Sequence, residues 1–137
     1  PKGGNMLHTL RQIVNNDEKW REILRGLNST FYHQTVTTKQ IEDYLSNATG
    51  VNLTAFFNHY LRDTRIPTLE YFFKKGFINF RWTNCVSGFD MPVKVTLNGA
   101  EQVLAPKTEW KNIATKTENQ KLDVNRNFYV ASFNITE

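Results

Sequence analysis

The spacing of apolar residues changes at Pro67, and this change limits the fold more than any other feature of the sequence. Before Pro67, apolar residues recur every three or four positions, which is typical of helices with one buried face. After it, they alternate with polar residues, which is typical of β-strands. A proline also favours a boundary, because the residue before it is pushed toward extended geometry. The sequence therefore predicts an α+β fold with a helical domain at 1–66 and a β-sandwich domain at 67–137.

Four short helices are predicted in the first domain, each with one apolar stripe that needs a neighbouring element to cover it. The expected helix-capping residues are Asn16 or Asp17, the capping box of Thr37 and Gln40, the left-handed stop Gly50, and Asn52. The expected apolar faces are Met6, Leu7, Leu10, Ile13 and Val14; Trp20, Ile23, Leu24, Leu27 and Phe31; Ile41, Tyr44 and Leu45; Phe56, Phe57, Tyr60 and Leu61. We expect these four helices to pack together, next to the sandwich.

Six or seven short strands are predicted in the second domain, which favours a small antiparallel β-sandwich. Two aromatic-rich runs flank Lys74–Gly76 and predict a hairpin, and a second turn is expected at Asn98–Gly99. Val93, Val95 and Leu97 are expected to point inward. Further strands are expected within 101–106, 108–115, 120–124 and 127–135.

The sequence contains one cysteine, so it has no internal disulfide. Cys85 lies in a segment that is predicted to be a strand, and we interpret it as a buried, inert thiol.

No complete active site can be assembled from the residues of this chain. None of the three histidines, His8, His33 and His59, has a second histidine or a cysteine two to five residues after it, and H-E-x-x-H is absent. We expect each to lie at the surface or to cap an element. Glu42 and Asp43 are adjacent on a helix, so their carboxylates should diverge into solvent. We predict no catalytic residue and no metal ligand in the chain.

The charge and hydropathy of the chain bear on its partners. The net charge of +4 comes from 17 basic and 13 acidic residues that are scattered along the sequence. A basic nucleic-acid-binding module is therefore only weakly supported, and it would show a steep dependence of affinity on salt. No apolar run approaches the ~18 residues that a membrane span requires. We expect neither nucleic acid nor a membrane span.

Several motifs resemble the zinc aminopeptidases of the aminopeptidase N type (peptidase family M-one, gluzincins). Lys2–Gly3, followed by a helix, is similar to the end of that family's Y-x-K-G motif. Gly50–Leu53 with Phe56–Phe57, and then Pro67–Leu69, are similar to the family's last helices and the exit from them. Three departures from the family pattern occur. Tyr60 stands where a tryptophan is common, Thr64–Pro67 replaces a turn that contains glycine, and Asn125 stands in the usual place of an aspartate.

The resemblance implies that the chain is a piece of a longer parent protein. In that family, an H-E-x-x-H helix and a downstream glutamate hold zinc, and the tyrosine of Y-x-K-G stabilises the tetrahedral intermediate. The tyrosine would lie one position before Pro1, so we expect a C-terminal fragment that lacks the zinc site and cleaves nothing. The parent is expected to use zinc and to remove N-terminal amino acids from peptides. Residues 1–66 would pack against its missing N-terminal catalytic region.

An alternative from a different functional class remains open. The chain could be a non-catalytic helical and β-sandwich module that binds a protein or a glycan. Trp82 and Trp110 are the aromatic side chains that could form its binding surface, although packing in the core is the simpler use for both.

The sequence leaves the cellular location of the protein open between the cytoplasm and the cell envelope of a bacterium.

Overall fold

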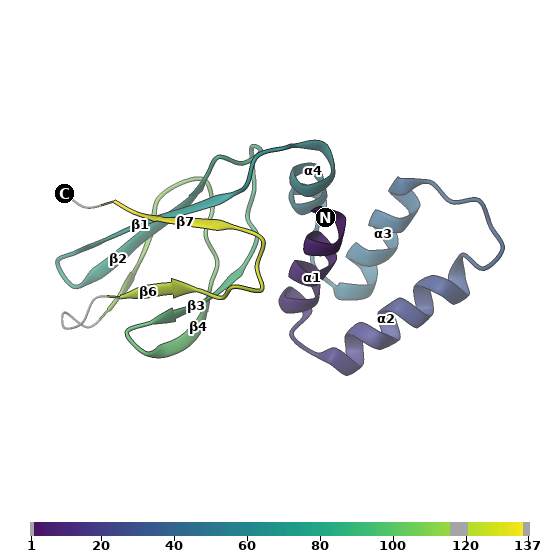
Figure 1. Cartoon of the computed structure of the whole chain (residues 1–137), viewed down its shortest axis with the longest axis horizontal. Coiled ribbons are helices and arrows are strands. Elements are labelled where there is room, and N and C mark those ends of the chain that lie inside the picture. The colour runs from purple at the N-terminus through teal and green to yellow at the C-terminus, as the bar shows by residue number, and fades with distance from the viewer. Residues whose placement is uncertain (1, 116–120, 136–137) are drawn as a thin grey trace.

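The computed structural model describes residues 2–115 and 121–135, with side chains from residue 4 onward. In these residues four helices are followed by seven strands, which confirms the predicted α+β fold (Figure 1). The helices are α1 (Lys2–Val14), α2 (Asp17–Thr30), α3 (Thr38–Thr49) and α4 (Thr54–Arg62). The strands are β1 (Thr68–Lys74), β2 (Phe77–Thr83), β3 (Val93–Leu97), β4 (Ala100–Leu104), β5 (Lys111–Ala114), β6 (Leu122–Val124) and β7 (Ala131–Asn134).

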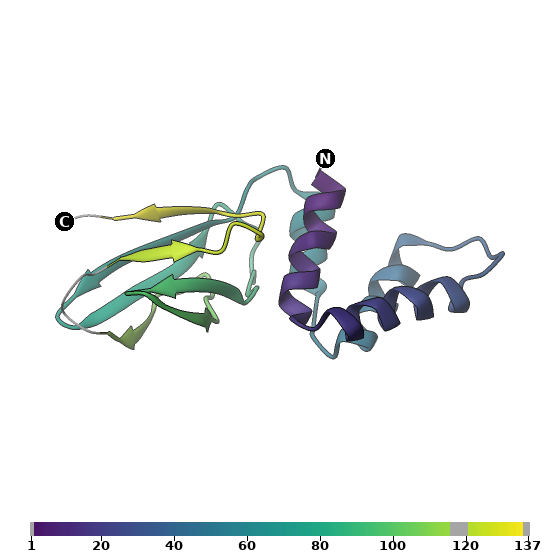
Figure 2. The same cartoon turned by 60° about the horizontal axis from the view of Figure 1, so that its bottom comes forward.

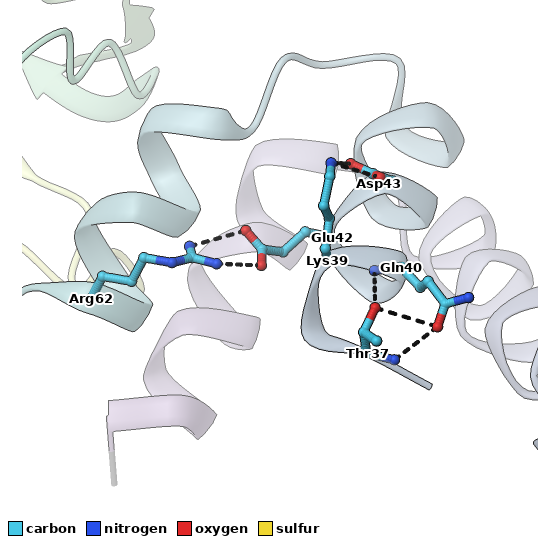
Figure 3. A network of polar contacts seen from close by, with 6 residues as sticks. All are labelled: Thr37, Lys39, Gln40, Glu42, Asp43 and Arg62. Carbon is cyan, nitrogen blue, oxygen red and sulfur yellow. Dashed lines mark hydrogen bonds and ion pairs between the residues drawn. The ribbon is translucent and has the colours of Figure 1, made fainter. Parts of the chain in front are cut away.

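The helical half (residues 2–62) begins and ends its helices largely where local sequence predicts. The Asn16 side chain caps α2 by accepting a hydrogen bond from the backbone N–H of Lys19 at 3.0 Å. Thr37 and Gln40 form the predicted capping box at the start of α3, visible in Figure 3. Gly50 ends α3 with a φ of 72°, a left-handed conformation that glycine adopts without steric penalty.

Two predictions about the helices are wrong in detail. The N-cap of α4 is Leu53 rather than Asn52, although Asn52 Oδ1 accepts a hydrogen bond from the backbone N–H of Thr54 at 3.1 Å. Three leucines that were placed on buried faces are exposed instead. They are Leu7 (43% exposed), Leu24 (36%) and Leu61 (43%). Each lies at the margin of its apolar stripe, where periodicity alone does not determine burial.

The strand half (residues 68–134) contains two small sheets among its described residues. One has the order β5-β2-β1-β7 and the other the order β4-β3-β6. The pairs are antiparallel except for β1 and β7, which run parallel. Lys75 and Gly76, and likewise Asn98 and Gly99, have positive φ values at the two turns, as a two-residue type I′ hairpin requires. Both predicted turns are confirmed.

The strand predicted through Cys85 ends too early to include it. β2 stops at Thr83, and Asn84 has a φ of 53°, which turns the chain out of the sheet. Cys85 therefore lies in the loop between β2 and β3, where it is half-buried. Burial raises the pKa of its thiol, which favours the protonated form.

The core of the molecule extends through both halves. The inward residues Val93, Val95 and Leu97 are 0 to 4% exposed, as predicted, and belong to the same buried cluster as Leu10 and Phe57 of the helices. In both views α1 and α4 lie against the strand half, and α2 and α3 lie farther out (Figures 1 and 2). Pro67 lies between α4 and β1, at the predicted change of structure. The division into two domains stays a prediction.

Candidate functional site: the first helix and its supports

Helix α1 begins with Lys2 and Gly3, the two residues in which the sequence resembles the end of a peptidase motif, so its surroundings are described first. Lys2 and Gly3 lie in its first turn, and their side chains are outside the described part of the structure. Met6 and Leu10 bury the face of α1 that contacts the core, at 8% and 0% exposure. The position of this motif therefore depends on what holds α1 in place.

Thr9 ties α1 to the segment that precedes β7. Its side chain is fully buried, and its hydroxyl donates to the carbonyl oxygen of Asn5 at 2.8 Å. The same hydroxyl accepts a hydrogen bond from the backbone N–H of Tyr129 at 3.0 Å. At the preceding, exposed position of the helix, His8 Nε2 lies 3.0 Å from Asn127 Oδ1. Two adjacent residues of α1 thus contact a segment about 120 positions later in the chain.

Tyr60 of α4 holds the same segment from a second helix. Its hydroxyl donates to the carbonyl oxygen of Tyr129 at 2.8 Å, and its side chain is 2% exposed. Burial raises the pKa of Tyr60 far above the ordinary value for tyrosine. The backbone of Tyr129 is therefore fixed on both sides, with its N–H bound by Thr9 and its carbonyl bound by Tyr60. We call these three residues the Tyr129 clamp.

The far end of α1 has weaker, more exposed supports. The Asn15 side chain accepts a hydrogen bond from Lys94 at the start of β3. Arg11 Nε lies 2.8 Å from Asp17 Oδ1 across the α1–α2 corner. This hydrogen bond lowers the pKa of the Asp17 carboxyl, but both side chains are largely exposed. An exposed pair of this kind adds little stability.

The predicted carboxylate pair does diverge. Glu42 accepts two hydrogen bonds from the Arg62 guanidinium, at 2.7 and 3.1 Å, and so joins α3 to α4 (Figure 3). Asp43 points to Lys39 on its own helix, at 3.0 Å. Asp43 is exposed as expected, whereas the Glu42 side chain is only 15% exposed. Neither arrangement brings two carboxylates to one reacting centre.

The histidines behave differently from one another. His8 and His33 are exposed, as predicted. His59 is 0% exposed, so the prediction of a surface or capping role is wrong for this residue. Within residues 2–115 and 121–135, no group of three or more His, Cys, Asp or Glu side chains could hold a metal ion. These residues do not fit a zinc site, and no catalytic step is assigned to them.

The two tryptophans considered for a binding surface have opposite environments. Trp82 is 1% exposed and donates its indole N–H to the carbonyl oxygen of Met91 at 3.0 Å, so it belongs to the core. Trp110 is 42% exposed and packs with Phe72, whose ring centroid lies 5.0 Å away. The Arg81 guanidinium lies 4.5 Å from the centroid of the Trp110 ring. Only Trp110 could contribute to a surface contact.

An apolar groove lies on the side of the helical half away from the strands. Its volume is about 620 Å³, and its lining includes Leu27, Phe31, Val36 and Ile41 around the α2–α3 connection. Tyr32 lies at this groove with 71% of its surface exposed.

In the part of the chain that the structure describes, no helix is long and apolar enough to cross a membrane.

Comparison with known proteins shows a likeness in fold to a solved structure. No protein-family model and no curated protein sequence matches the chain. Among solved structures, it is similar to Legionella pneumophila aminopeptidase A, crystallised in complex with aspartic acid, with a TM-score of 0.76 and 15% sequence identity. The match covers 99% of this chain and 17% of that chain. At this identity the likeness shows the fold: the chain has the fold of part of an aminopeptidase.

Sequence reasoning placed Tyr60 on a buried face but missed two polar residues, Thr9 of the Tyr129 clamp and His59. Thr9 lies three positions after Met6, and His59 lies three positions after Phe56, so helical spacing places both on buried faces. A search for apolar stripes that also admitted polar residues would have identified both. Tyr129 contributes through its backbone, and no side-chain pattern marks such a contact.

Proposed function

We propose that this chain forms the C-terminal portion of a zinc-dependent aminopeptidase that removes N-terminal amino acids from peptides. The observation that carries the proposal is the similarity of almost the whole chain to 17% of an aminopeptidase, at a TM-score of 0.76. The resemblance of Lys2–Gly3 and the helix after it to the end of a Y-x-K-G motif supports the same assignment.

The role of this portion is to position the active site. In the proposed parent, the catalytic tyrosine directly precedes Pro1, so the placement of α1 sets the placement of that tyrosine. The Tyr129 clamp and the buried face of α1 restrict the motion of the helix. Such restriction matters because a misplacement of about 1 Å at a reacting centre can lower a rate by ~100-fold.

The zinc ligands, the general base and the tyrosine are assigned to the rest of the parent. The described residues supply no ligand set, so we derive no chemical step from them.

The rest of the parent would also cover apolar side chains that are exposed on the helical half. Leu7, Leu24 and Leu61 are at least a third exposed, and Tyr32 is more exposed still. Contact with the N-terminal catalytic region would cover such residues and remove apolar area from water.

An activity assay on two proteins tests the proposal. The chain alone is incubated with zinc and an aminoacyl-anilide substrate, and the longer protein encoded by the same gene is assayed in parallel. We expect no turnover above a buffer blank from the chain. The longer protein should release the anilide, lose activity after treatment with a chelator, and regain it with zinc. Turnover by the chain alone would contradict the structural role, and an inactive, zinc-free longer protein would contradict the peptidase assignment.

A further inference from the structure

His59 occupies an unusual place for an ionisable side chain, at the contact between the two halves of the molecule. It lies on α4 and is completely buried. Its ring packs against Tyr60 and Phe89, with centroid distances of 5.3 and 4.9 Å. Phe89 belongs to the loop between β2 and β3, so the imidazole is enclosed by aromatic rings from both halves.

The two ring nitrogens of His59 form hydrogen bonds of opposite direction. Nε2 lies 2.8 Å from the carbonyl oxygen of Arg65, and because a carbonyl only accepts, Nε2 must carry a hydrogen. Nδ1 lies 3.3 Å from the backbone nitrogen of Val86, whose N–H donates, so Nδ1 must present a lone pair. Together the two partners select the neutral imidazole with its hydrogen on Nε2.

These bonds link α4 to the connection that directly follows it and to a loop 27 residues later in the chain. Arg65 lies in the connection from α4 to β1, and Val86 lies in the loop after β2. A second proton on the ring would place Nδ1–H against the N–H of Val86, two donors facing each other. That proton would also introduce a charge into a buried site, where water cannot solvate it.

The charged and titratable groups around the ring come from each of these segments. Asp63 follows α4, and the hydrogen bonds it accepts from Arg65 hold the pKa of its carboxyl well below the usual range, with a smaller electrostatic contribution from His59. Its negative charge favours a protonated ring, whereas the positive charge of Arg65 opposes it. The two are paired at 2.8 Å, so their effects on the ring partly cancel. Cys85 and Tyr60 stay neutral, because burial raises the pKa of each.

We propose that His59 is an acid-sensitive latch that holds the helical half against the strand half. The latch is closed when the imidazole is neutral and bonded to both Arg65 and Val86. It opens in acid, when a second proton removes the bond from Val86. In an unfolded chain a histidine titrates near pH ~6.5. Because the folded structure holds the neutral form, unfolding takes up a proton below that pH, and stability decreases as pH falls.

Replacement of His59 by glutamine provides the test. A glutamine amide has both an N–H donor and a carbonyl acceptor, so it can bind Arg65 and Val86 without titrating. Urea unfolding is measured at pH 7.5 and 5.5 for the unmodified chain, His59→Gln, and the matched control His33→Gln, which changes an exposed histidine. Between these pH values, His59 should lower the folding equilibrium constant of the unmodified chain by roughly tenfold.

The expected result is that His33→Gln retains this loss and His59→Gln lacks it. An equal loss in both variants would overturn the proposal. If His59→Gln does not fold, nitrogen NMR of the histidine rings in the unmodified chain decides the question. The proposal requires one ring to stay in the neutral form with hydrogen on Nε2 at pH 6, while the exposed rings titrate. Detection of a protonated His59 ring at pH 7 would overturn it.

Discussion

Tyr129 shows how a single residue joins the two halves of this molecule through its backbone. Its N–H is bound by the Thr9 hydroxyl of α1, and its carbonyl by the Tyr60 hydroxyl of α4. Both hydroxyl groups are almost completely shielded from water. Each bond therefore satisfies a group that would otherwise be buried without a partner, a loss that typically costs about 1–3 kcal/mol. At the scale of residues, the junction depends on a few satisfied polar groups inside an apolar core.

The first prediction concerns Tyr60 at alkaline pH. Its pKa is raised above the value of about 10 in an unfolded chain, so the folded state retains the proton longer. The stability from this group is present below pH ~10 and decreases as pH rises above it. We expect Tyr60→Phe to be less stable by about 1 kcal/mol at pH 8. Above pH 10, its stability should decline less steeply than that of the unmodified chain, in urea unfolding from pH 8 to 11.

Tyr32→Phe is the matched control, since Tyr32 is 71% exposed and should leave the slope unchanged. If Tyr60→Phe declined with pH as steeply as the unmodified chain, the account of its buried hydroxyl would be wrong.

At the scale of elements, α2 and α3 approach each other closely at Gly26. The Tyr44 hydroxyl of α3 donates to the carbonyl oxygen of Ile23 at 3.1 Å, and it passes over Gly26 to reach it. A side-chain carbon at position 26 would overlap the Tyr44 hydroxyl oxygen. The glycine is therefore required by packing, although glycine within a helix is usually less favourable than alanine by about 1 kcal/mol.

A double substitution tests this close approach. Gly26→Ala should destabilise the chain, because displacement of Tyr44 outweighs the gain in helix propensity. In the background of Tyr44→Phe, which lacks the obstructing oxygen, the same Gly26→Ala change should be neutral or stabilising. The measurement is the free energy of urea unfolding for both single variants and the double variant. A stabilising Gly26→Ala in the unmodified chain would show that the two helices separate without cost.

The sequence predicted those elements whose signals are local. The helix cap expected at Asn16 or Asp17, the Thr37–Gln40 box and both hairpin turns depend on residues within a few positions of one another, and all were confirmed, with Asn16 as the cap. The end of β2 before Cys85 was missed because it depends on the left-handed conformation of Asn84. An asparagine can also adopt extended geometry, so its presence in the sequence does not mark the end of a strand. The parallel pairing of β1 with β7 joins segments about 60 residues apart, and no local pattern encodes it. The buried His59 was misplaced because polarity was weighted above helical spacing.

At the scale of the whole molecule, the helices and the strands share one buried cluster, and α1 lies between the strand half and α2 (Figures 1 and 2). The strand half thus supports the helix that begins with Lys2–Gly3. In the proposed parent, this arrangement would transmit the rigidity of the sheets to the active site. A disturbance of the junction should then affect catalysis without affecting the metal.

Thr9→Val in the longer protein tests that transmission. Valine has nearly the same shape but leaves the N–H of Tyr129 without its acceptor. We expect kcat to fall on the order of 10- to 100-fold, with KM and zinc content unchanged, because the tyrosine is displaced while the zinc site stays intact. The control is Thr35→Val, at an exposed position in the α2–α3 connection. An unchanged kcat in a folded Thr9→Val protein would contradict the positioning role.

The most direct test of the central claim is to sequence the gene upstream of the codon for Pro1. The proposal predicts a tyrosine codon immediately before Pro1 and, farther upstream, codons for H-E-x-x-H followed by a glutamate that completes a zinc site. A start codon at or just before Pro1, or an upstream region without a two-histidine zinc motif, would contradict the assignment of this chain to a zinc aminopeptidase.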